Sequence, residues 1–244
     1  APIPKGTCSG SGRNTLELPE AGGTIREGRT IMEGGSASAR ARVLKHQKKD
    51  LMVLGIHGSP RGVQSRTRML MQWVLAGAET AGATTDLVDL ASLRIEACSA
   101  CESCSLTGTC VYNDDFVSLY DRMIAADGIV LGSPVYIDNV SGQMKIFFDR
   151  LADAIHYQTL SGKYGCAVAT TWSSGGEEVV AYLNHVLNYL GILTLEGISV
   201  AIGDDPGSLY REESRARSLG ERLAGAIRAQ EQYPGQARSI EENR

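Results

Sequence analysis

The sequence contains few aromatic residues and no long apolar run. Only three Phe and two Trp occur among 244 residues. No stretch reaches roughly eighteen apolar residues, so a membrane-spanning helix is not expected. The N-terminal segment lacks the apolar centre of a signal peptide, which suggests a lost initiator Met and a cytoplasmic protein. Cysteines stay reduced in that compartment, and clustered ones usually bind metal.

Charge is divided unevenly along the chain. Residues 1–50 hold nine Lys or Arg against five Asp or Glu, a net of +4, whereas the other 194 residues hold fifteen against twenty-three, a net of −8. The basic segment has no Phe, Tyr or Trp to stack on a base, so nucleic-acid binding is not expected. We interpret it as an extended arm, rich in Gly, Ser and Arg, that docks on its own acidic body or on a neighbouring subunit's.

From residue 51 onward, apolar runs alternate with helical patterns. Strands are predicted over residues 51–57, 84–90, 128–133, 164–171 and 193–201. Helices are predicted over about 70–81, 115–126, 141–154, 177–189 and 209–231. This alternation implies a doubly wound parallel sheet, and five strands fit the flavodoxin-like order 2-1-3-4-5, with a ligand beyond their carboxyl ends. The domain is assigned to residues 51–232 and a polar tail to residues 233–244.

The first predicted strand runs into a loop, Gly58-Ser-Pro-Arg-Gly-Val-Gln-Ser-Arg-Thr67, and then into a helix. Such a turn points backbone N–H groups and a positive helix end at an anion. Its hydroxyls and guanidinium groups belong to Ser59, Ser65, Thr67, Arg61 and Arg66. No Lys follows a Gly in this loop, which excludes an ATP-type P-loop, and the missing Gly-x-Gly-x-x-Gly disfavours a tightly bound NAD. The alternative is an ordinary polar turn.

Residues after the third predicted strand suit a flat ring. Pro134 and its successors can press backbone against such a ring, and Tyr136 and Ile137 can give it an apolar wall. Ser141 can cap the next helix. His57, beside the first loop, can either contact a cofactor or serve as a structural polar residue.

Four of the six cysteines fall within thirteen residues, as Cys98-x2-Cys101-x2-Cys104-x5-Cys110. Four thiolates can hold a tetrahedral Zn²⁺ or the irons of a cubane cluster. Structural zinc usually takes two Cys-x2-Cys pairs with a long spacer, so the crowding favours a [4Fe–4S] cluster. Zinc and free or redox-active thiols remain as alternatives. Cys8 and Cys166 are not expected to be ligands.

Three motifs in order carry a family resemblance. Gly-Ser-Pro-Arg followed by Ser-x-Thr, and Ser-Pro-Val-Tyr followed by Ser-Gly-Gln-x-Lys and Asp-Arg, resemble the NAD(P)H-dependent FMN reductases. With the four cysteines and Asp114-Asp115 added, residues 51–230 resemble the iron–sulfur flavoproteins, a flavodoxin-fold branch carrying FMN and a [4Fe–4S] cluster. Two departures occur in the first loop, which is one residue longer than usual and has Arg66 where Asn is common.

The resemblance implies FMN-binding residues in three loops and four cluster ligands. The FMN-binding residues are Ser59, Arg61, Ser65, Arg66, Thr67, Pro134, Val135, Tyr136, Ile137, Thr171, Trp172, Ser173, Gly175 and Gly176. The cluster ligands are Cys98, Cys101, Cys104 and Cys110. No catalytic side chain is assigned, because the flavin ring itself accepts hydride or electrons.

The resemblance also implies a reaction and partners. Single electrons would pass from a carrier such as ferredoxin through the cluster to FMN and on to a small acceptor, in a homo-oligomer, either a dimer or a tetramer. Two alternatives stay open. One is an NAD(P)H-dependent FMN or quinone reductase with structural cysteines, and the other is a non-catalytic flavodoxin-like module with a zinc knuckle.

Overall fold

The computed structural model describes residues 50–205 and 207–242. Cys8 and the predicted arm, apart from its last residue, lie outside this range. In the described part of the chain, no helix combines the length and the apolar character needed to cross a membrane.

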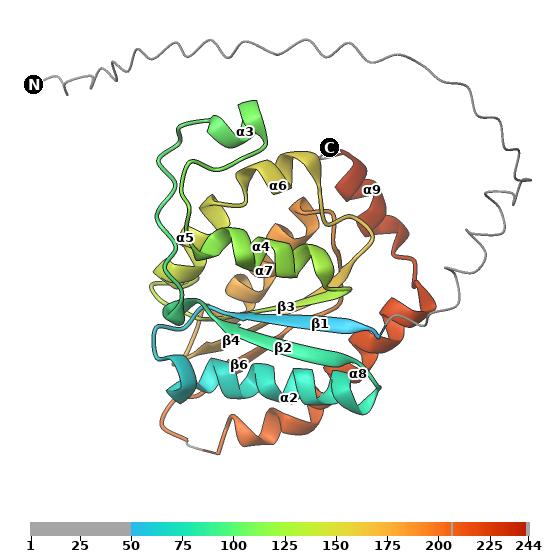
Figure 1. The fold of residues 1–244 in the computed structure, drawn as a ribbon. Coiled ribbons are helices and arrows are strands. Elements are labelled where there is room, and N and C mark those ends of the chain that lie inside the picture. The colour runs from blue at the N-terminus through green and yellow to red at the C-terminus, as the bar shows by residue number, and fades with distance from the viewer. Residues whose placement is uncertain (1–49, 206, 243–244) are drawn as a thin grey trace, which may run out of the picture. The chain divides into compact units, whose positions relative to one another are not determined.

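One parallel sheet forms the centre of the domain. Its strands are β1 (Met52–His57), β2 (Thr84–Asp89), β3 (Gly128–Pro134), β4 (Tyr164–Thr171), β5 (Leu193–Thr194) and β6 (Ile198–Ala201). They follow the order β2-β1-β3-β4-β5, with β6 also paired to β4. This order confirms the predicted flavodoxin-like sheet (Figure 1). Strands β3 and β4 are buried along their whole length, as strands covered on both faces must be.

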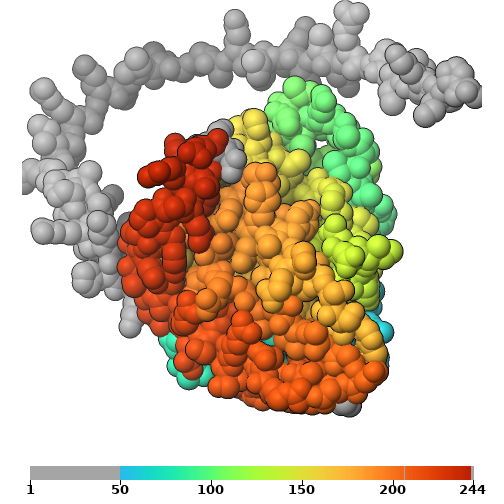
Figure 2. All heavy atoms as spheres, turned by 180° about the vertical axis from the view of Figure 1, so that it is seen from behind, coloured from blue at the N-terminus to red at the C-terminus, as the bar shows by residue number. Residues whose placement is uncertain are grey.

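Helices pack on both faces of the sheet (Figure 1). One face is covered by α2 (Arg66–Thr80) and α8 (Glu213–Ala229). The other is covered by α4 (Asp115–Ala125), α5 (Gly142–Asp149) and α7 (Gly176–Tyr189). From behind, the segments that follow β4 make up most of the visible surface (Figure 2). The short elements are η2 (Gly62–Gln64), η3 (Leu90–Ser92), α3 (Ser103–Thr107), α6 (Ala152–Tyr157), η4 (Tyr210–Glu212) and α9 (Pro234–Glu242).

The fifth predicted strand, over residues 193–201, is two strands in the structure. β5 pairs with Tyr164 and Gly165 of β4, and β6 pairs with β4 from Val168 onward. The chain between them passes so close to β4 that a Cβ on Gly197 would lie 2.4 Å from the Ala167 carbonyl oxygen. Gly197 therefore permits this approach, and the ladder is interrupted there.

Two helix predictions and the prediction of a polar tail needed correction. The helix predicted over 141–154 divides into α5 and α6, with Arg150 and Leu151 between them. The one predicted over 209–231 begins as η4 and continues as α8. The polar tail contains α9, whose Gln236 side chain donates to the Thr194 carbonyl at 2.7 Å and accepts from the Thr194 N–H at 2.8 Å. These two hydrogen bonds attach the tail to the backbone of β5.

Candidate functional site

Three loops meet at the carboxyl ends of β1, β3 and β4. The Gly58 N–H donates to the Gly132 carbonyl at 2.8 Å, and the Ser141 hydroxyl donates to the Gly58 carbonyl. Thr67 and Thr170 share a hydroxyl hydrogen bond of 2.6 Å that joins the start of α2 to β4. These bonds bring the predicted FMN loops to one edge of the sheet, where ligands of this fold class bind.

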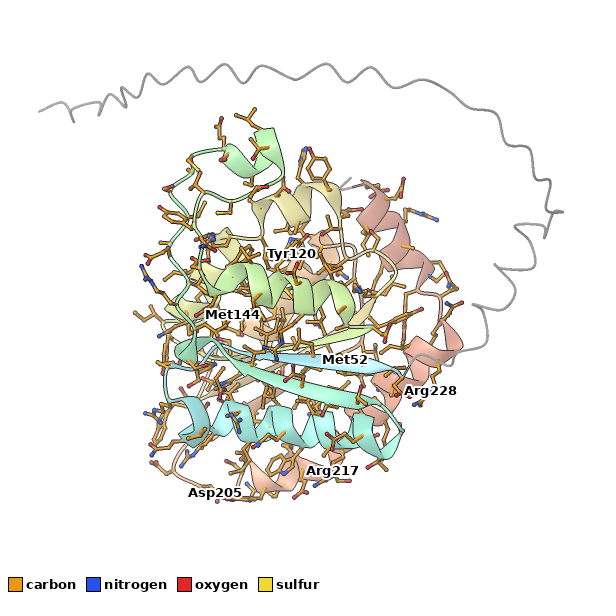
Figure 3. All side chains as sticks on the ribbon, viewed as in Figure 1. Met52, Tyr120, Met144, Asp205, Arg217 and Arg228 are labelled. Atoms are coloured by element: carbon orange, nitrogen blue, oxygen red, sulfur yellow. The ribbon has the colours of Figure 1, made fainter. Side chains whose placement is uncertain are left out.

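The loop after β1 surrounds the start of α2. Its predicted hydroxyl residues Ser59, Ser65 and Thr67 are buried, whereas Arg61 and Arg66 are exposed. Met144 of α5, labelled in Figure 3, packs so close to Gly58 that a Cβ added to Gly58 would lie 2.9 Å from the Met144 side chain. The loop therefore has a tightly packed floor, and its two arginines lie in solvent, free to meet an anion.

The hydroxyls of this loop have different partners. Ser65 caps α2 by accepting from the Arg68 N–H, and Thr67 is bonded to Thr170. Ser59 accepts from the Arg61 N–H at 3.3 Å. A hydroxyl that accepts one hydrogen bond can still donate another. Among the described contacts, the Ser59 hydroxyl is thus free to donate its proton to a ligand.

His57, at the end of β1, has no exposed surface and links the first loop to β2. Its Nδ1 lies 2.7 Å from Asp89 Oδ1, and its Nε2 lies 3.0 Å from Ser65 Oγ. Arg68 Nε donates to the same carboxylate at 3.0 Å. An ionised carboxylate only accepts, so Nδ1 carries the proton and Nε2 of the neutral ring accepts from Ser65. His57 is therefore a structural polar residue that orients Ser65.

Burial lowers the pKa of His57 below its ordinary value, although Asp89 opposes the shift. The unfolded chain then binds more protons than the folded chain below about pH 6.5, the ordinary histidine pKa, so the free energy of unfolding falls as the pH falls. We expect His57→Asn, which keeps a donor toward Asp89, to flatten this decline. Urea unfolding between about pH 7.5 and 5.5 measures how steeply the free energy of unfolding falls in the native protein and in the variant. Both proteins contain the other histidines, so the difference between the two slopes is due to His57. Equal slopes in the two proteins would contradict the assignment.

The loop after β3 makes a tight turn. The Tyr136 N–H donates to the Asn139 carbonyl at 2.9 Å, and the reverse bond measures 3.2 Å. The two central residues, Ile137 and Asp138, have φ values of 51° and 53°. A β-branched residue rarely adopts this conformation, and Ile137 is also 99% exposed. The turn therefore holds an apolar side chain in solvent, beside half-exposed Tyr136.

The loop after β4 lies against that turn. Gly175, with a φ of 77°, caps α7, and a Cβ there would lie 2.7 Å from Asp138 Oδ1. The following Gly176 approaches Ser199 so closely that a Cβ would lie 2.1 Å from its hydroxyl oxygen. Trp172, the first residue after β4, is 63% exposed. The predicted ring-binding residues of both loops are thus adjacent, with apolar side chains open to solvent.

The cysteine segment leaves the sheet after η3 and extends beside α4 and α6 (Figure 1). Ala100, Glu102 and Gly108 have φ values of 52°, 60° and 71°, so the chain reverses direction sharply around the cysteines. The Ala100 N–H donates to Cys98 Sγ at 3.4 Å. A cavity of about 330 Å³ is lined by all four predicted ligands and by Tyr120 of α4, which Figure 3 labels.

An ion pair closes the base of this segment. Arg150 Nη1 lies 2.6 Å from Asp114 Oδ2, and the two side chains are 1% and 3% exposed. Asp114 also accepts from the Glu96 N–H at 2.9 Å, while Arg150 donates to the Glu96 carbonyl at 2.9 Å. Burial alone would raise the pKa of Asp114, but the hydrogen bonds from Arg150 and Glu96 hold it below its usual value. The two ends of the cysteine segment are thereby joined at a buried charged pair.

Arg150 also faces the cysteines. Its Nη2 donates to Cys110 Sγ at 3.3 Å, and its guanidinium lies 4.6 Å from the centre of the Phe116 ring. Its buried Nε has no hydrogen-bond partner among the described residues. A guanidinium that donates to one of the four cysteines and also lines their cavity suits an anionic group there.

The four cysteines line one cavity. In residues 50–205 and 207–242, no three His, Cys, Asp or Glu side chains lie close enough together to hold one metal ion. A cubane separates its thiolates more widely, because each binds a different iron. Four cysteines around one cavity, with a cationic donor in its wall, are the residues that could hold such a cluster.

The structure brings most predicted residues together and adds others. The fourteen predicted FMN residues lie in three adjoining loops and in the strand and helix ends that flank them, and the four cysteines line one cavity. Sequence reasoning missed the contacts of Arg150 and the link from His57 to Ser65. A charged residue next to the apolar stretch Phe147-Phe148 and Leu151 was the available signal for Arg150. Cys166 is fully buried in β4, and burial raises the pKa of its thiol to about 12, consistent with a structural role.

The chain is similar in sequence to a known family. The family model for NADPH-dependent FMN reductase matches residues 51–207. An iron–sulfur flavoprotein of Archaeoglobus fulgidus is 36% identical over 179 residues, which cover 72% of this chain and 80% of that protein. An iron–sulfur flavoprotein of Methanocaldococcus jannaschii is 30% identical over 190 residues, covering 73% of this chain and 98% of the relative.

Solved structures share the fold. A flavone reductase superposes with a TM-score of 0.61 at 19% identity, covering 73% of this chain and 63% of the other. An NAD(P)H:quinone oxidoreductase from Methanothermobacter marburgensis gives 0.58 at 17% identity, covering 71% and 96%. At such identities the likeness concerns the fold alone. The family match and the relatives carry the assignment: this chain belongs to the NADPH-dependent FMN reductase family of flavin-dependent oxidoreductases, among relatives named iron–sulfur flavoproteins.

Proposed function

We propose that this chain is an electron-transfer oxidoreductase that uses FMN and a [4Fe–4S] cluster. Single electrons come from a carrier such as ferredoxin and leave by way of FMN to a small acceptor. The observation that carries the proposal is the single cavity lined by Cys98, Cys101, Cys104 and Cys110 with Arg150 in its wall. A chain that only bound flavin would have no need of it.

The parts of the chain have separate tasks in this proposal. The start of α2 and the loop before it bind the FMN phosphate, while the loops after β3 and β4 hold the ring. The four cysteines hold the cluster. FMN supplies the exchange of one or two electrons, which matches a one-electron carrier to a two-electron acceptor.

Helix α5 connects the two sites. Ser141, which caps it, bonds the Gly58 carbonyl in the first loop. Arg150, just after its end, bonds Cys110. Eight residues of α-helix span about 12 Å, so one rigid element fixes the distance between the flavin loops and the cysteine cavity.

A direct hydride route is the second candidate. The matching family is described as NADPH-dependent, so this chain could reduce FMN with NAD(P)H while the cysteines are structural. Anaerobic reduction of the holoprotein separates the two. The proposal predicts that reduced ferredoxin reduces the flavin much faster than NADPH does. Rapid reduction by NADPH, equally fast after the cysteines are replaced, would favour the second candidate.

Ser59 offers a test of the phosphate site. We expect Ser59→Ala to weaken FMN binding, since losing a hydrogen bond to a charged group costs about 1.5–3 kcal/mol, or roughly ten- to hundredfold in affinity. Titration calorimetry with the apoprotein measures the change. Riboflavin, which has the same ring and no phosphate, serves as the control and should bind both proteins equally. An equal loss for the two ligands would mean that Ser59 supports only the loop.

The proposed partners are a ferredoxin-type carrier or NAD(P)H, a small-molecule acceptor, and further copies of the chain. Exposed apolar side chains at the flavin loops support self-association, since Ile137 is 99% and Trp172 63% exposed. The mass of the holoprotein measured by light scattering tests it, and a monomer would contradict it.

A further inference from the structure

We propose that Arg150 is a positioning residue that fixes Cys110 and raises the reduction potential of the iron–sulfur cluster, with Asp114 acting in the opposite direction. This inference rests on the proposed function, because it assumes that the four cysteines hold the cluster. It assigns to the Arg150–Asp114 pair a redox role in addition to closing the cysteine segment.

The contacts of Arg150 favour negative charge at the cysteines. Its guanidinium is 1% exposed, and Nη2 donates to Cys110 Sγ at 3.3 Å. Arg150 also lines the cavity that the four cysteines share, so its charge lies close to the group they would hold. A cluster gains one negative charge when it is reduced, and hydrogen bonds to its sulfurs favour that form. Arg150 therefore raises the potential.

Asp114 moderates this effect. Its Oδ1 accepts from the same Nη2 at 3.1 Å, and its Oδ2 lies 2.6 Å from Nη1. The carboxylate thus cancels part of the guanidinium charge, while the N–H bond still points its positive end at the sulfur. Removing the carboxylate charge leaves the cation uncompensated, so the potential should rise.

The two halves of the pair therefore give opposite predictions. A purely structural pair would give shifts of one sign, because losing either partner disturbs the same buried contact. Opposite shifts require that the charges act on the cluster itself. Lys145 provides a matched control, since it is a half-exposed cation on α5 whose described partner is Asp149.

Redox titration of the anaerobically purified full chain, followed by electron paramagnetic resonance, measures the potential. We expect Arg150→Gln to lower the equilibrium constant for one-electron reduction about tenfold, which is 59 mV, and Asp114→Asn to raise it. Arg150→Lys should fall between Arg150→Gln and the native protein, because it keeps the charge and loses the planar fork. Lys145→Gln should leave the potential unchanged.

The outcomes separate the inference from the proposed function. Shifts of the same sign for Arg150→Gln and Asp114→Asn, or a native potential in Arg150→Gln with its iron retained, would overturn the inference alone. If Arg150→Gln does not fold, Arg150→Lys takes its place. The inference then predicts a lower potential for Arg150→Lys and a higher one for Asp114→Asn, and shifts of the same sign would overturn it. A native chain that binds FMN and lacks iron would overturn the proposed function and, with it, this inference.

Discussion

Replacing Cys104 by Ala is expected to remove the iron–sulfur cluster and to leave FMN bound. Cys104 is one of the four cysteines around the cavity, and a cubane needs a ligand for each iron. The flavin loops lie at the carboxyl ends of β1, β3 and β4, whereas the cavity is lined by residues between 98 and 121 and between 149 and 154. Iron should therefore fall from about four atoms per chain to nearly none, with one flavin retained. Iron and flavin analysis of the purified variant measures both.

Cys166→Ala is the matched control for that experiment. Its thiol is buried in β4, and its pKa is raised to about 12, so it is not available as a thiolate ligand. The control should keep both iron and flavin. If Cys104→Ala loses the flavin together with the iron, the two sites depend on each other, and the division of tasks proposed above is wrong.

Asp114→Ala is expected to destabilise the protein more than any surface substitution. It leaves the Arg150 charge buried without its carboxylate and removes the acceptor for the Glu96 N–H and the cap of α4. Breaking one partner of a buried pair costs about 3–5 kcal/mol in the free energy of unfolding. Urea unfolding of the apoprotein measures the loss without any contribution from a bound cluster.

Glu213→Ala supplies the comparison, because Glu213 pairs with Arg217 on the surface of α8, with about two fifths of each side chain exposed. Exposed pairs contribute about 0–1 kcal/mol.

The double variant Asp114→Asn with Arg150→Met tests the pair directly. Its free energy of unfolding should fall by less than the sum of the two single changes, since neither charge is then left alone. Equal effects of Asp114→Ala and Glu213→Ala would show that the buried pair does not stabilise the fold.

The fold was predictable because its signals are local and strong. Short continuous apolar runs such as 51–57 and 164–171 are typical of strands buried on both faces, and their alternation with helices leaves few possible topologies. The division of the last strand was not predictable, because it depends on how closely Gly197 approaches Ala167 in the folded chain. Helix α9 was missed for a similar reason, since a lone Ile240 and the amide of Gln236 dock it.

The sequence motifs of the candidate site were predictable, whereas the side-chain contacts that connect them were not. The spacing of four cysteines is visible in the sequence, as is a hydroxyl-rich loop before a helix. Arg150 reaches Cys110 across forty positions, and His57 reaches Asp89 across thirty-two. Such contacts depend on tertiary packing, for which a single sequence has no period or spacing rule. The split between α5 and α6, where Arg150 lies, was not predicted either, because it also depends on tertiary packing.

The central claim is that one chain carries both FMN and a [4Fe–4S] cluster. Iron, sulfide, zinc and flavin analysis of the anaerobically purified native protein tests it most directly. The account predicts one FMN with about four irons and four sulfides per chain. Flavin without iron, or zinc without flavin, would contradict it.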